Sequence, residues 1–273
     1  MISALAVAGR LLDEPRYRDA AARAATFALE HLRGPDAELR RSFKDGRAGQ
    51  SGSNDGFLDD YAFLVAGLID LYEATFDPRW LGEALALAHQ TERRFADAAG
   101  GGWFMTSHAH EALIARERPA YDGAEPSGTS VALMNAVRLA AFTGDDQWRQ
   151  VAERGFGAHA ATLSERPNAM TEALLALDFF LDVPLEIALV WPAGAFDAAA
   201  PLAAILRATF VPSRALAGAA APNVAAAGKV VSFIREKVAV GDHLTAYVCR
   251  RGVCQLPATE PAQLQAQLRS DHS

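Results

Sequence analysis

The sequence repeats one pattern three times: a helix that is apolar on nearly every side, a short turn, and an amphipathic helix. An aromatic residue near the start of each second helix marks the repeat. These residues, Tyr17, Trp80 and Trp148, lie 63 and 68 residues apart. Such spacings fit consecutive helix–turn–helix units, which bury their apolar faces by stacking. We therefore expect a mainly α fold built from helical hairpins.

The two helices of each unit differ in how many of their faces must be buried. We expect first helices over 1–12, 60–75 and 128–142, second helices over 16–32, 80–95 and 147–163, and a fourth first-type helix over 170–181. A helix that is apolar all round must be covered on all sides, whereas an amphipathic helix can face water. The alternation predicts an inner layer wrapped by an outer layer. Periodicity alone leaves a partial (α/α)6 toroid and an open α-solenoid as alternatives.

An aspartate lies just ahead of each second helix: Asp13, Asp77 and Asp145. A side-chain oxygen at this position can accept hydrogen bonds from the free N–H groups of the first helical turn. We expect all three to cap their helices.

The connections favour the toroid. Turns within a unit are short, but the connections over 33–57 and 97–127 are long, and long loops in compact domains are usually functional. Both contain glycine-rich turns that predict β-hairpins, one with a strand at 39–43 before Asp45-Gly46 and one pairing 103–106 with 112–116. Long loops on one rim of a helical ring would wall a central cavity.

The character of the sequence changes around residues 182–184. Strands are expected over 185–191 and 244–249, helices over 201–210 and 261–269, and a loose connection over 215–228. We predict two parts: a partial (α/α)6 toroid over 1–183 and a small α/β appendage over 184–273.

Charge and composition exclude several classes of partner. With 26 basic and 33 acidic residues the net charge is −7, and no basic stripe interleaves with aromatics, which argues against nucleic acid. Apolar runs are shorter than the roughly 20 residues that span a bilayer, so no membrane partner is expected. Two cysteines cannot form a disulfide scaffold, and the N-terminus does not resemble a signal peptide, so we expect a cytoplasmic protein. The high alanine and arginine content suggests a GC-rich bacterial genome.

Acidic residues gather at the starts of two neighbouring inner helices. Asp59 and Asp60 begin one helix, and Asp122 and Glu125 precede the next. Carboxylates at helix N-termini cap free N–H groups, which is the structural interpretation. In the functional interpretation, Asp60, Glu125 and Asp122 are catalytic, because paired carboxylates supply the general acid and base of glycoside hydrolysis and sugar epimerisation. Asp59 would then bind the ligand.

Other residues at the expected rim are candidates for ligand contact. Tyr61 and Trp103 either stack on a sugar ring or pack in the core. His108 forms a His-x-His pair with His110, but no third ligand follows at a suitable spacing, so no metal site is expected. His108 is then an exposed loop residue or a proton-transfer group. No nucleotide fingerprint is present, and no cofactor is expected.

The two cysteines, Cys249 and Cys254, have a C-x4-C spacing. This spacing matches neither a zinc site nor the C-x-x-C of a thioredoxin active site. Burial, a disulfide across a turn and a redox role stay open as alternatives.

Three motifs together resemble a known family. They are Gly-Phe-Leu-Asp-Asp-Tyr-Ala-Phe at 56–63, Asp-Gly-Ala-Glu-Pro-Ser-Gly at 122–128, and Tyr-Val-Cys at 247–249 followed by Cys254 and Pro257. From Met1 to about Leu268 the chain resembles the C-terminal half of the YyaL-type thioredoxin-domain-containing proteins, the spermatogenesis-associated thioredoxin-like family. Thr129 departs from the family pattern, which usually has Asn after Ser-Gly.

The resemblance implies a fold and a missing partner. Members carry a thioredoxin-like domain followed by a six-hairpin toroid similar to glycosidases and N-acylglucosamine 2-epimerases. The chain would lack that domain and the first half of the toroid, so its partner would be the missing N-terminal half of the same protein. Met1 also begins inside an apolar helix, with no polar leader to cap it.

Two functions follow as hypotheses. In the first, the toroid binds or processes a carbohydrate-like ligand, with glycoside hydrolase-like or epimerase-like chemistry if it is an enzyme. In the second, it is a non-catalytic scaffold that serves a thioredoxin-like domain in redox or protein quality control.

Overall fold

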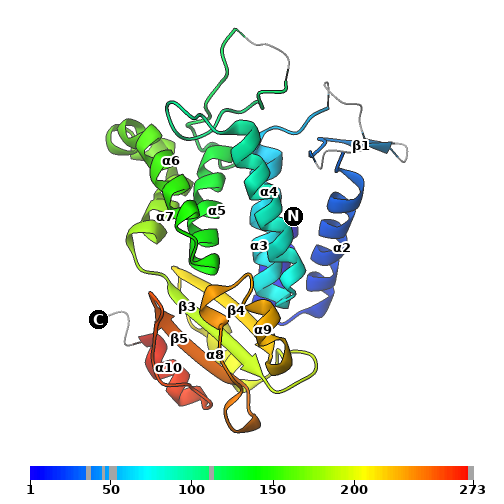
Figure 1. Cartoon of the computed structure of the whole chain (residues 1–273), viewed down its shortest axis with the longest axis vertical. Coiled ribbons are helices and arrows are strands. Elements are labelled where there is room, and N and C mark those ends of the chain that lie inside the picture. Colours follow the sequence, from blue (N-terminus) through cyan, green and yellow to red (C-terminus); the bar gives the residue numbers. More distant parts are fainter. Residues whose placement is uncertain (35–37, 45–46, 49–53, 111–113, 270–273) are drawn as a thin grey trace.

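The computed structural model describes residues 1–34, 38–44, 47–48, 54–110 and 114–269. It is mainly helical, with one four-stranded mixed sheet. Figure 1 shows the long helices standing above the sheet, with the long loops at the opposite end. Both segments predicted to contain long loops therefore leave the helices at the same end.

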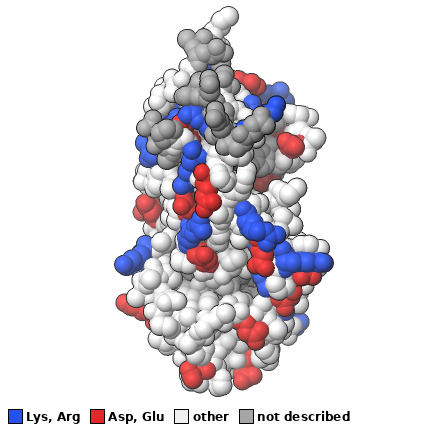
Figure 2. All heavy atoms as spheres, turned by 90° about the vertical axis from the view of Figure 1, so that its right-hand side faces the viewer, with Lys and Arg blue, Asp and Glu red and all other residues white. Residues whose placement is uncertain are grey.

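Four helices lie side by side in one layer, each contacting the next: α1 (Ile2–Leu11), α3 (Leu58–Thr75), α5 (Gly128–Thr143) and α7 (Thr171–Leu181). Three more pack on their own preceding helix: α2 (Pro15–His31), α4 (Pro78–Phe95) and α6 (Asp146–Glu165). The predicted packing of inner and outer helices in two layers is observed, and the helix bounds differ from the expected ones by at most two residues. Closure of these layers into a toroid stays a prediction. Figure 2 shows basic and acidic residues interspersed on the face seen there. Some polar side chains of the outer helices are buried, among them Gln90 and Thr91 of α4 and His159 of α6.

The capping prediction is confirmed at two of the three aspartates. Asp77 accepts a hydrogen bond from the Arg79 N–H at 2.9 Å, and Asp145 caps α6 in the same way. At α2 the prediction is wrong, because Glu14 occupies the N-cap position and Asp13 lies one residue outside, at φ 52°. Proline is favoured in the first helical turn and sets where the helix begins. Asp77 directly precedes its proline, whereas Glu14 separates Asp13 from Pro15.

The sheet has the strand order β4-β3-β5-β6. Strand β3 (Leu185–Trp191) pairs in parallel with β4 (Arg214–Ala220) and antiparallel with β5 (Thr245–Arg250), which pairs with β6 (Val253–Cys254). Successive side chains of β3 point to opposite faces. Ile187 and Leu189 join a core with α8 (Pro201–Ala208) and α10 (Pro261–Arg269), whereas Ala188 and Val190 join the core of the helical layer.

Strand β4 corrects the expectation of a loose connection over 215–228. The strand is followed by the short helices η2 (Ala221–Asn223) and α9 (Val224–Ala227). Alanine and glycine have low β propensity, but propensity in sheets depends strongly on packing context. Ala215, Ala217 and Ala219 lie on the face that packs against the helices, where small side chains allow close approach.

The two hairpins predicted in the long loops have different outcomes in the structure. Strands β1 (Phe43–Lys44) and β2 (Arg47–Ala48) pair antiparallel on either side of Asp45-Gly46, which lies outside the described residues. The expected strand at 103–106 is wrong: Trp103 forms only an isolated bridge to Ala96. Its expected partner at 112–116 lies partly outside the described residues.

The remaining short elements are the 3-10 helices η1 (Pro167–Ala169), η3 (Ser232–Ile234) and η4 (Val240–Asp242). The change from helices to sheet falls between Leu181 and Leu185, near the predicted boundary at 183/184. The division into two parts stays a prediction, because the larger core contains side chains from both. Across the described part of the chain, no helix is long and apolar enough to cross a membrane.

Candidate functional site

The N-terminal ends of α3 and α5 meet through Asp59. Its Oδ1 accepts a hydrogen bond from the Gly128 N–H at 2.9 Å. A side chain at position 128 would collide with this carboxylate, because its Cβ would lie 2.2 Å from Oδ1. Burial raises the pKa of Asp59, the Gly128 hydrogen bond opposes the shift, and the nearby Asp60 and Glu125 charges add to it. The structure thus brings these three acidic residues into electrostatic range of one another.

Asp60 helps to begin α3. Its Oδ2 accepts a hydrogen bond from the Phe57 N–H at 2.8 Å and forms an ion pair with Arg41 Nε at 3.3 Å. The Arg41 guanidinium lies over the Phe57 ring at 4.4 Å, and the His110 ring stacks on Phe57 with centroids 5.2 Å apart. Asp60 therefore has a capping role, yet it remains partly exposed beside a cation and two rings.

Asp122 and Glu125 are used differently. Asp122 accepts hydrogen bonds from the Ser127 N–H at 2.8 Å and the Ser127 hydroxyl at 2.9 Å through Oδ1, and from the Glu172 N–H at 2.8 Å through Oδ2. Both of its oxygens thus fix backbone, which matches the structural interpretation. The side chain of Glu125 is exposed.

Tyr61 and Trp103 are buried, as the packing interpretation expects. The Tyr61 hydroxyl accepts a hydrogen bond from the Leu39 N–H at 2.7 Å, and its ring packs edge-on against Phe95. Trp103 donates from Nε1 to Glu92 at 2.5 Å. Neither residue presents a free ring face to a ligand in this structure.

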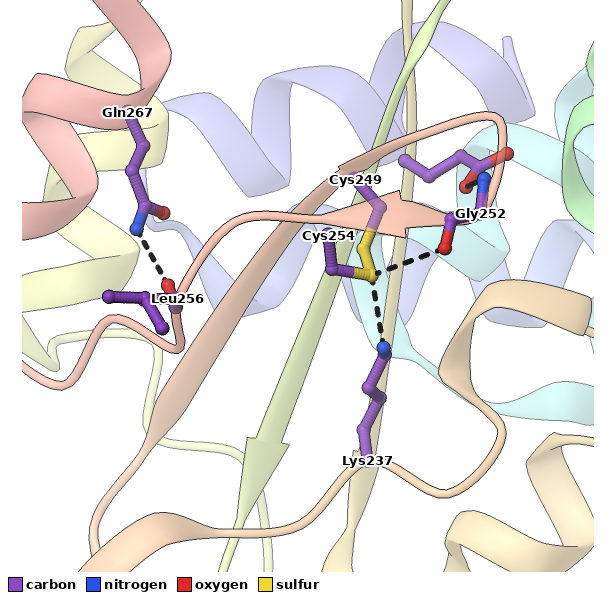
Figure 3. The surroundings of a disulfide bond; sticks show 7 residues. Lys237, Cys249, Gly252, Cys254, Leu256 and Gln267 are labelled. Carbon is purple, nitrogen blue, oxygen red and sulfur yellow. Dashed lines mark hydrogen bonds between the residues drawn. A yellow bond between two sulfur atoms is a disulfide. The ribbon is translucent and has the colours of Figure 1, made fainter.

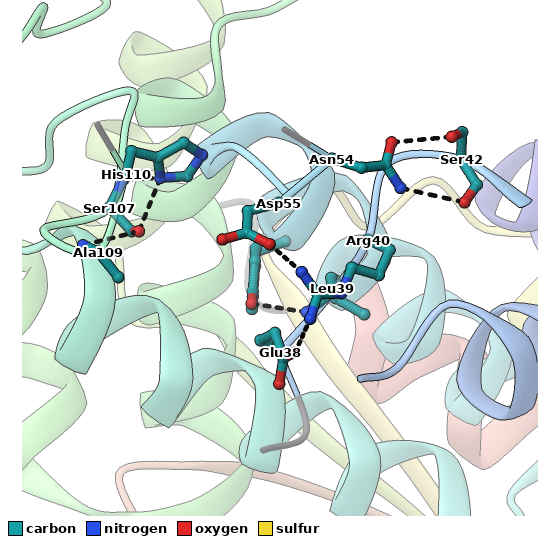
Figure 4. A network of polar contacts seen from close by, with 10 residues as sticks. Glu38, Leu39, Arg40, Ser42, Asn54, Asp55, Ser107, Ala109 and His110 are labelled. Atoms are coloured by element: carbon teal, nitrogen blue, oxygen red, sulfur yellow. Dashed lines mark hydrogen bonds and ion pairs between the residues drawn. The ribbon is translucent and has the colours of Figure 1, made fainter. Parts of the chain in front are cut away.

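The polar network beside Tyr61 holds the first long loop (Figure 4). Arg40, almost fully buried, lies between the carboxylates of Glu38 and Asp55 and forms ion pairs with both. A buried cation needs such partners to offset its lost hydration. We assign this network to loop stability.

The histidines of the second loop do not gather metal ligands. His108 is exposed, and its Nδ1 lies 3.2 Å from the Arg94 carbonyl oxygen. His110 Nδ1 lies 2.7 Å from the Ser107 hydroxyl (Figure 4). In the described ranges, no three His, Cys, Asp or Glu side chains are grouped so that they could hold a metal ion.

The two cysteines are joined by a disulfide across the β5–β6 hairpin (Figure 3). Cys249 is buried, whereas Cys254 is partly exposed. The Lys237 ammonium lies 3.0 Å from Cys254 Sγ. Of the alternatives that the spacing left open, the structure shows the bond across the turn, with burial of one of the two sulfurs.

A groove along the exposed side of the inner helices contains residues that sequence reasoning missed. It has a volume of about 480 Å³, and its polar lining includes Ser3, Asp70, Arg138 and Glu172. Arg138 forms an ion pair with Asp70 at 2.8 Å. Burial acts to lower the pKa of Arg138, but the neighbouring Asp70 and Glu73 carboxylates outweigh it and raise the pKa.

Glu172 lies in the first turn of α7, on the wall of this groove. Burial raises its pKa, and the neighbouring Asp122 raises it further, while Arg138 opposes the shift. Phe63, 41% exposed, supplies an aromatic surface in the same groove. The sequence did contain a signal for these residues, because Asp70, Arg138 and Glu172 are charged residues within helices that are mostly apolar.

No family model matches the chain. Human Spermatogenesis-associated protein 20 is 31% identical over 271 residues, which cover 97% of this chain and 34% of the human protein. The chain spans about a third of the length of its curated relatives. The rat protein of the same name is 30% identical over the same extent, and an uncharacterized protein of Caenorhabditis elegans is 32% identical over 180 residues.

These similarities agree with part of the family resemblance. They are consistent with the chain corresponding to the C-terminal part of a larger protein. All of these relatives are animal proteins, so the expectation of a bacterial source receives no support from them.

Proposed function

We propose that the chain is part of a longer protein in which the groove along α1, α3, α5 and α7 binds a carbohydrate-type ligand. In this proposal the two helical layers form part of an (α/α)6 ring, completed by hairpins from the rest of that protein. The main support is the groove of about 480 Å³, which combines carboxylates, a guanidinium and an exposed aromatic ring.

The groove suits a polyhydroxylated molecule. Asp70 and Glu172 can accept hydrogen bonds from hydroxyl groups, and Arg138 can donate them. The exposed Phe63 ring can pack against the apolar face of a pyranose, the role that the buried Tyr61 and Trp103 cannot fill here. The rim acids, Asp60 and Glu125, would contact parts of the ligand that extend toward the loops.

Glu172 is the best candidate for acid–base chemistry. A carboxyl group whose pKa is raised by burial keeps its proton at higher pH and can act as a general acid. If the protein is an enzyme, a second carboxylate at the rim would supply the base for glycoside hydrolase-like or epimerase-like chemistry. Asp60 and Glu125 remain the candidates for that role.

The test is a panel of mono- and oligosaccharides applied to the intact protein, with thermal shift and calorimetry as readouts. We expect at least one sugar to raise the melting temperature, and Glu172→Gln and Phe63→Ala to weaken its binding about tenfold or more. Such a loss corresponds to one or two hydrogen bonds or a stacking contact. Glu153→Gln, an exposed substitution on α6, is the matched control. Absence of any sugar-dependent stabilisation in the intact protein would overturn the proposal.

The disulfide favours a second candidate, in which the chain serves a thioredoxin-like dithiol. A thiolate of the dithiol attacks Cys254 Sγ, the Sγ–Sγ bond breaks, and Cys249 leaves as a thiolate. The second thiol of the dithiol loses its proton to solvent and, as a thiolate, attacks the dithiol's own sulfur in the mixed disulfide, which releases Cys254 as a thiolate. Two electrons pass from the dithiol, which becomes a disulfide. Lys237 is placed to stabilise the released Cys254 thiolate, because a nearby cation favours the charged form.

Quantitative thiol labelling in defined dithiol/disulfide buffers tests this candidate. We expect a reversible two-electron transition, with Cys254 alkylated faster than the buried Cys249 after reduction. Lys237→Met should slow alkylation of Cys254 at neutral pH because its thiolate loses the neighbouring cation, while the exposed control Lys229→Met should not. Labelling that finds the bond closed at every potential, or equal rates in both variants, would exclude the redox role.

A further inference from the structure

The lower end of the helical layer meets the sheet at two adjoining cavities, of about 270 and 610 Å³. Both are lined by Arg10 at the end of α1, Glu73 of α3, and Leu206 and Arg207 of α8. The residues shared by the two cavities are thus three charged groups and one aliphatic side chain, which shows that the cavities adjoin.

The smaller cavity is lined by more apolar than charged residues, and its charged residues include Arg18 and Asp19. Its walls include Phe76, Phe196 and the sheet residues Leu189 and Leu216, together with several alanines. The Phe76 and Phe196 rings meet edge to face, with centroids 5.0 Å apart. Largely apolar pockets with a few polar groups at one end are typical small-molecule sites.

Four arginines line the larger cavity, Arg10, Arg138, Arg207 and Arg214, against two carboxylates, Glu73 and Glu172, so its lining carries an excess of positive charge. Arg138 forms ion pairs with Asp70 at 2.8 Å and with Glu73 at 3.6 Å. Glu73 also accepts a hydrogen bond from the Leu216 N–H. Arg10 and Arg214 line the same cavity. Among the residues that the structure describes, neither has a carboxylate within 4.0 Å.

Arg214 is partly buried at the start of β4. Burial lowers its pKa, Glu73 opposes this shift, and Arg10 and Arg138 add to it. A guanidinium that has lost hydration and faces other cations carries an electrostatic cost, which a bound anion offsets. Arg207 already has partners: it donates a hydrogen bond to the Ala198 carbonyl and forms an ion pair with Asp13 at 3.8 Å.

We propose that these two cavities form a binding site for an amphiphilic anion. Its head, a carboxylate or a phosphate, lies between Arg10 and Arg214 in the larger cavity, where guanidinium groups can donate paired hydrogen bonds. Its apolar body enters the smaller cavity past Leu206. The larger cavity adjoins the carbohydrate groove and shares Met134, Arg138 and Glu172 with it. Arg10 and Arg214 do not line that groove, so their variants test this proposal independently of the sugar panel.

Four probes applied to the protein below their micelle concentrations test the proposal: octanoate, octyl phosphate, octanol and acetate. Calorimetry and thermal shift should show binding of octanoate or octyl phosphate at least tenfold tighter than that of octanol, which lacks the charge, and of acetate, which lacks the body. The tighter of the two anions identifies the head group that the arginines prefer.

Substitutions then locate the site. Arg10→Gln and Arg214→Gln should each weaken anion binding about tenfold, the loss expected for one charge-assisted hydrogen bond, and leave octanol binding unchanged. Arg214→Gln should not lower the melting temperature of the free protein, because it removes an uncompensated, partly buried charge. Ala195→Trp, at an exposed position on the smaller cavity, should block the apolar body. Arg16→Gln, an exposed arginine paired with Glu14 on α2, is the control.

Equal affinities for octanoate and octanol would overturn the proposal, as would unchanged anion binding in both arginine variants. Failure of all four probes to bind would also overturn it. That result would favour an acidic segment of the longer protein as the group that neutralises Arg10 and Arg214.

Discussion

The sheet and the layer of inner helices are both built from apolar elements, but they are covered differently. Helices α8 and α10 pack on one face of the sheet, and the helical layer packs on the other. The inner helices are covered by α2, α4 and α6 on one side. On the other side Phe63, Asp70, Arg138 and Glu172 line a groove. An apolar segment thus becomes a core element or a binding surface according to what packs against it.

The largest expected effect separates these two environments directly. Ile187, on the covered sheet, is fully buried, whereas Phe63, in the groove, is 41% exposed. Ile187→Ala should lower the free energy of unfolding by about 2–5 kcal/mol, because it leaves a cavity in a packed core. Phe63→Ala should lower it by less than about 1 kcal/mol. Urea denaturation of both variants measures the difference, and equal losses would show that the groove is part of a core.

A smaller effect concerns the contacts within and between the two regions. Asp77→Ala removes a helix cap inside the helical layer and should cost about 1 kcal/mol. Asp13 instead links the layer to α8 through ion pairs with Arg18 at 3.4 Å and Arg207 at 3.8 Å. Partly exposed pairs of this kind contribute about 0–1 kcal/mol, so Asp13→Ala should cost less. Thermal unfolding of both variants tests the order, and a larger loss for Asp13→Ala would show that the two regions depend on this link.

The smallest effect is a change in pH dependence at the groove. Because the pKa of Glu172 is raised above 4.5 in the folded chain, the folded state holds this proton more tightly than the unfolded state does. The contribution of Glu172 to stability is therefore full below pH 4.5 and is lost as the pH rises through the raised pKa. Glu172→Gln should gain stability relative to wild type between pH 4 and pH 7. Parallel stability profiles for the two proteins would contradict the assigned burial, and Glu153→Gln is the control.

Sequence patterns predicted the helices well because each inner and outer helix carries its own periodicity. They failed at β4, where the sequence Arg-Ala-Leu-Ala-Gly-Ala-Ala has low β propensity and only one large apolar side chain. The strand is specified by its neighbours, since β3 offers a parallel edge and the helices accept only small residues on that face. The failure at 103–106 has a related cause: Trp103 is held by Glu92 of α4 instead of a strand partner.

The candidate acidic residues were likewise predictable in one respect and not in another. Their positions at the starts of α3 and α5 could be predicted from local patterns, because a helix start is a local event. The groups that these carboxylates contact could not be predicted in this way. Asp59 is bound to a backbone group 69 residues away and Asp122 to one 50 residues away, whereas Glu125 remains exposed.

By itself, the sequence determined which segments become helices, which of them are apolar all round, and that acids gather at one end of them. These properties depend on periodicities of a few residues. Only the tertiary structure decided which carboxylates accept hydrogen bonds from backbone N–H groups and that Cys249 is bonded to Cys254. It also decided that Arg10 and Arg214 line one cavity without a carboxylate partner among the described residues. Hydration, charge and hydrogen bonding at such positions are set by groups from distant parts of the chain, which only packing brings together.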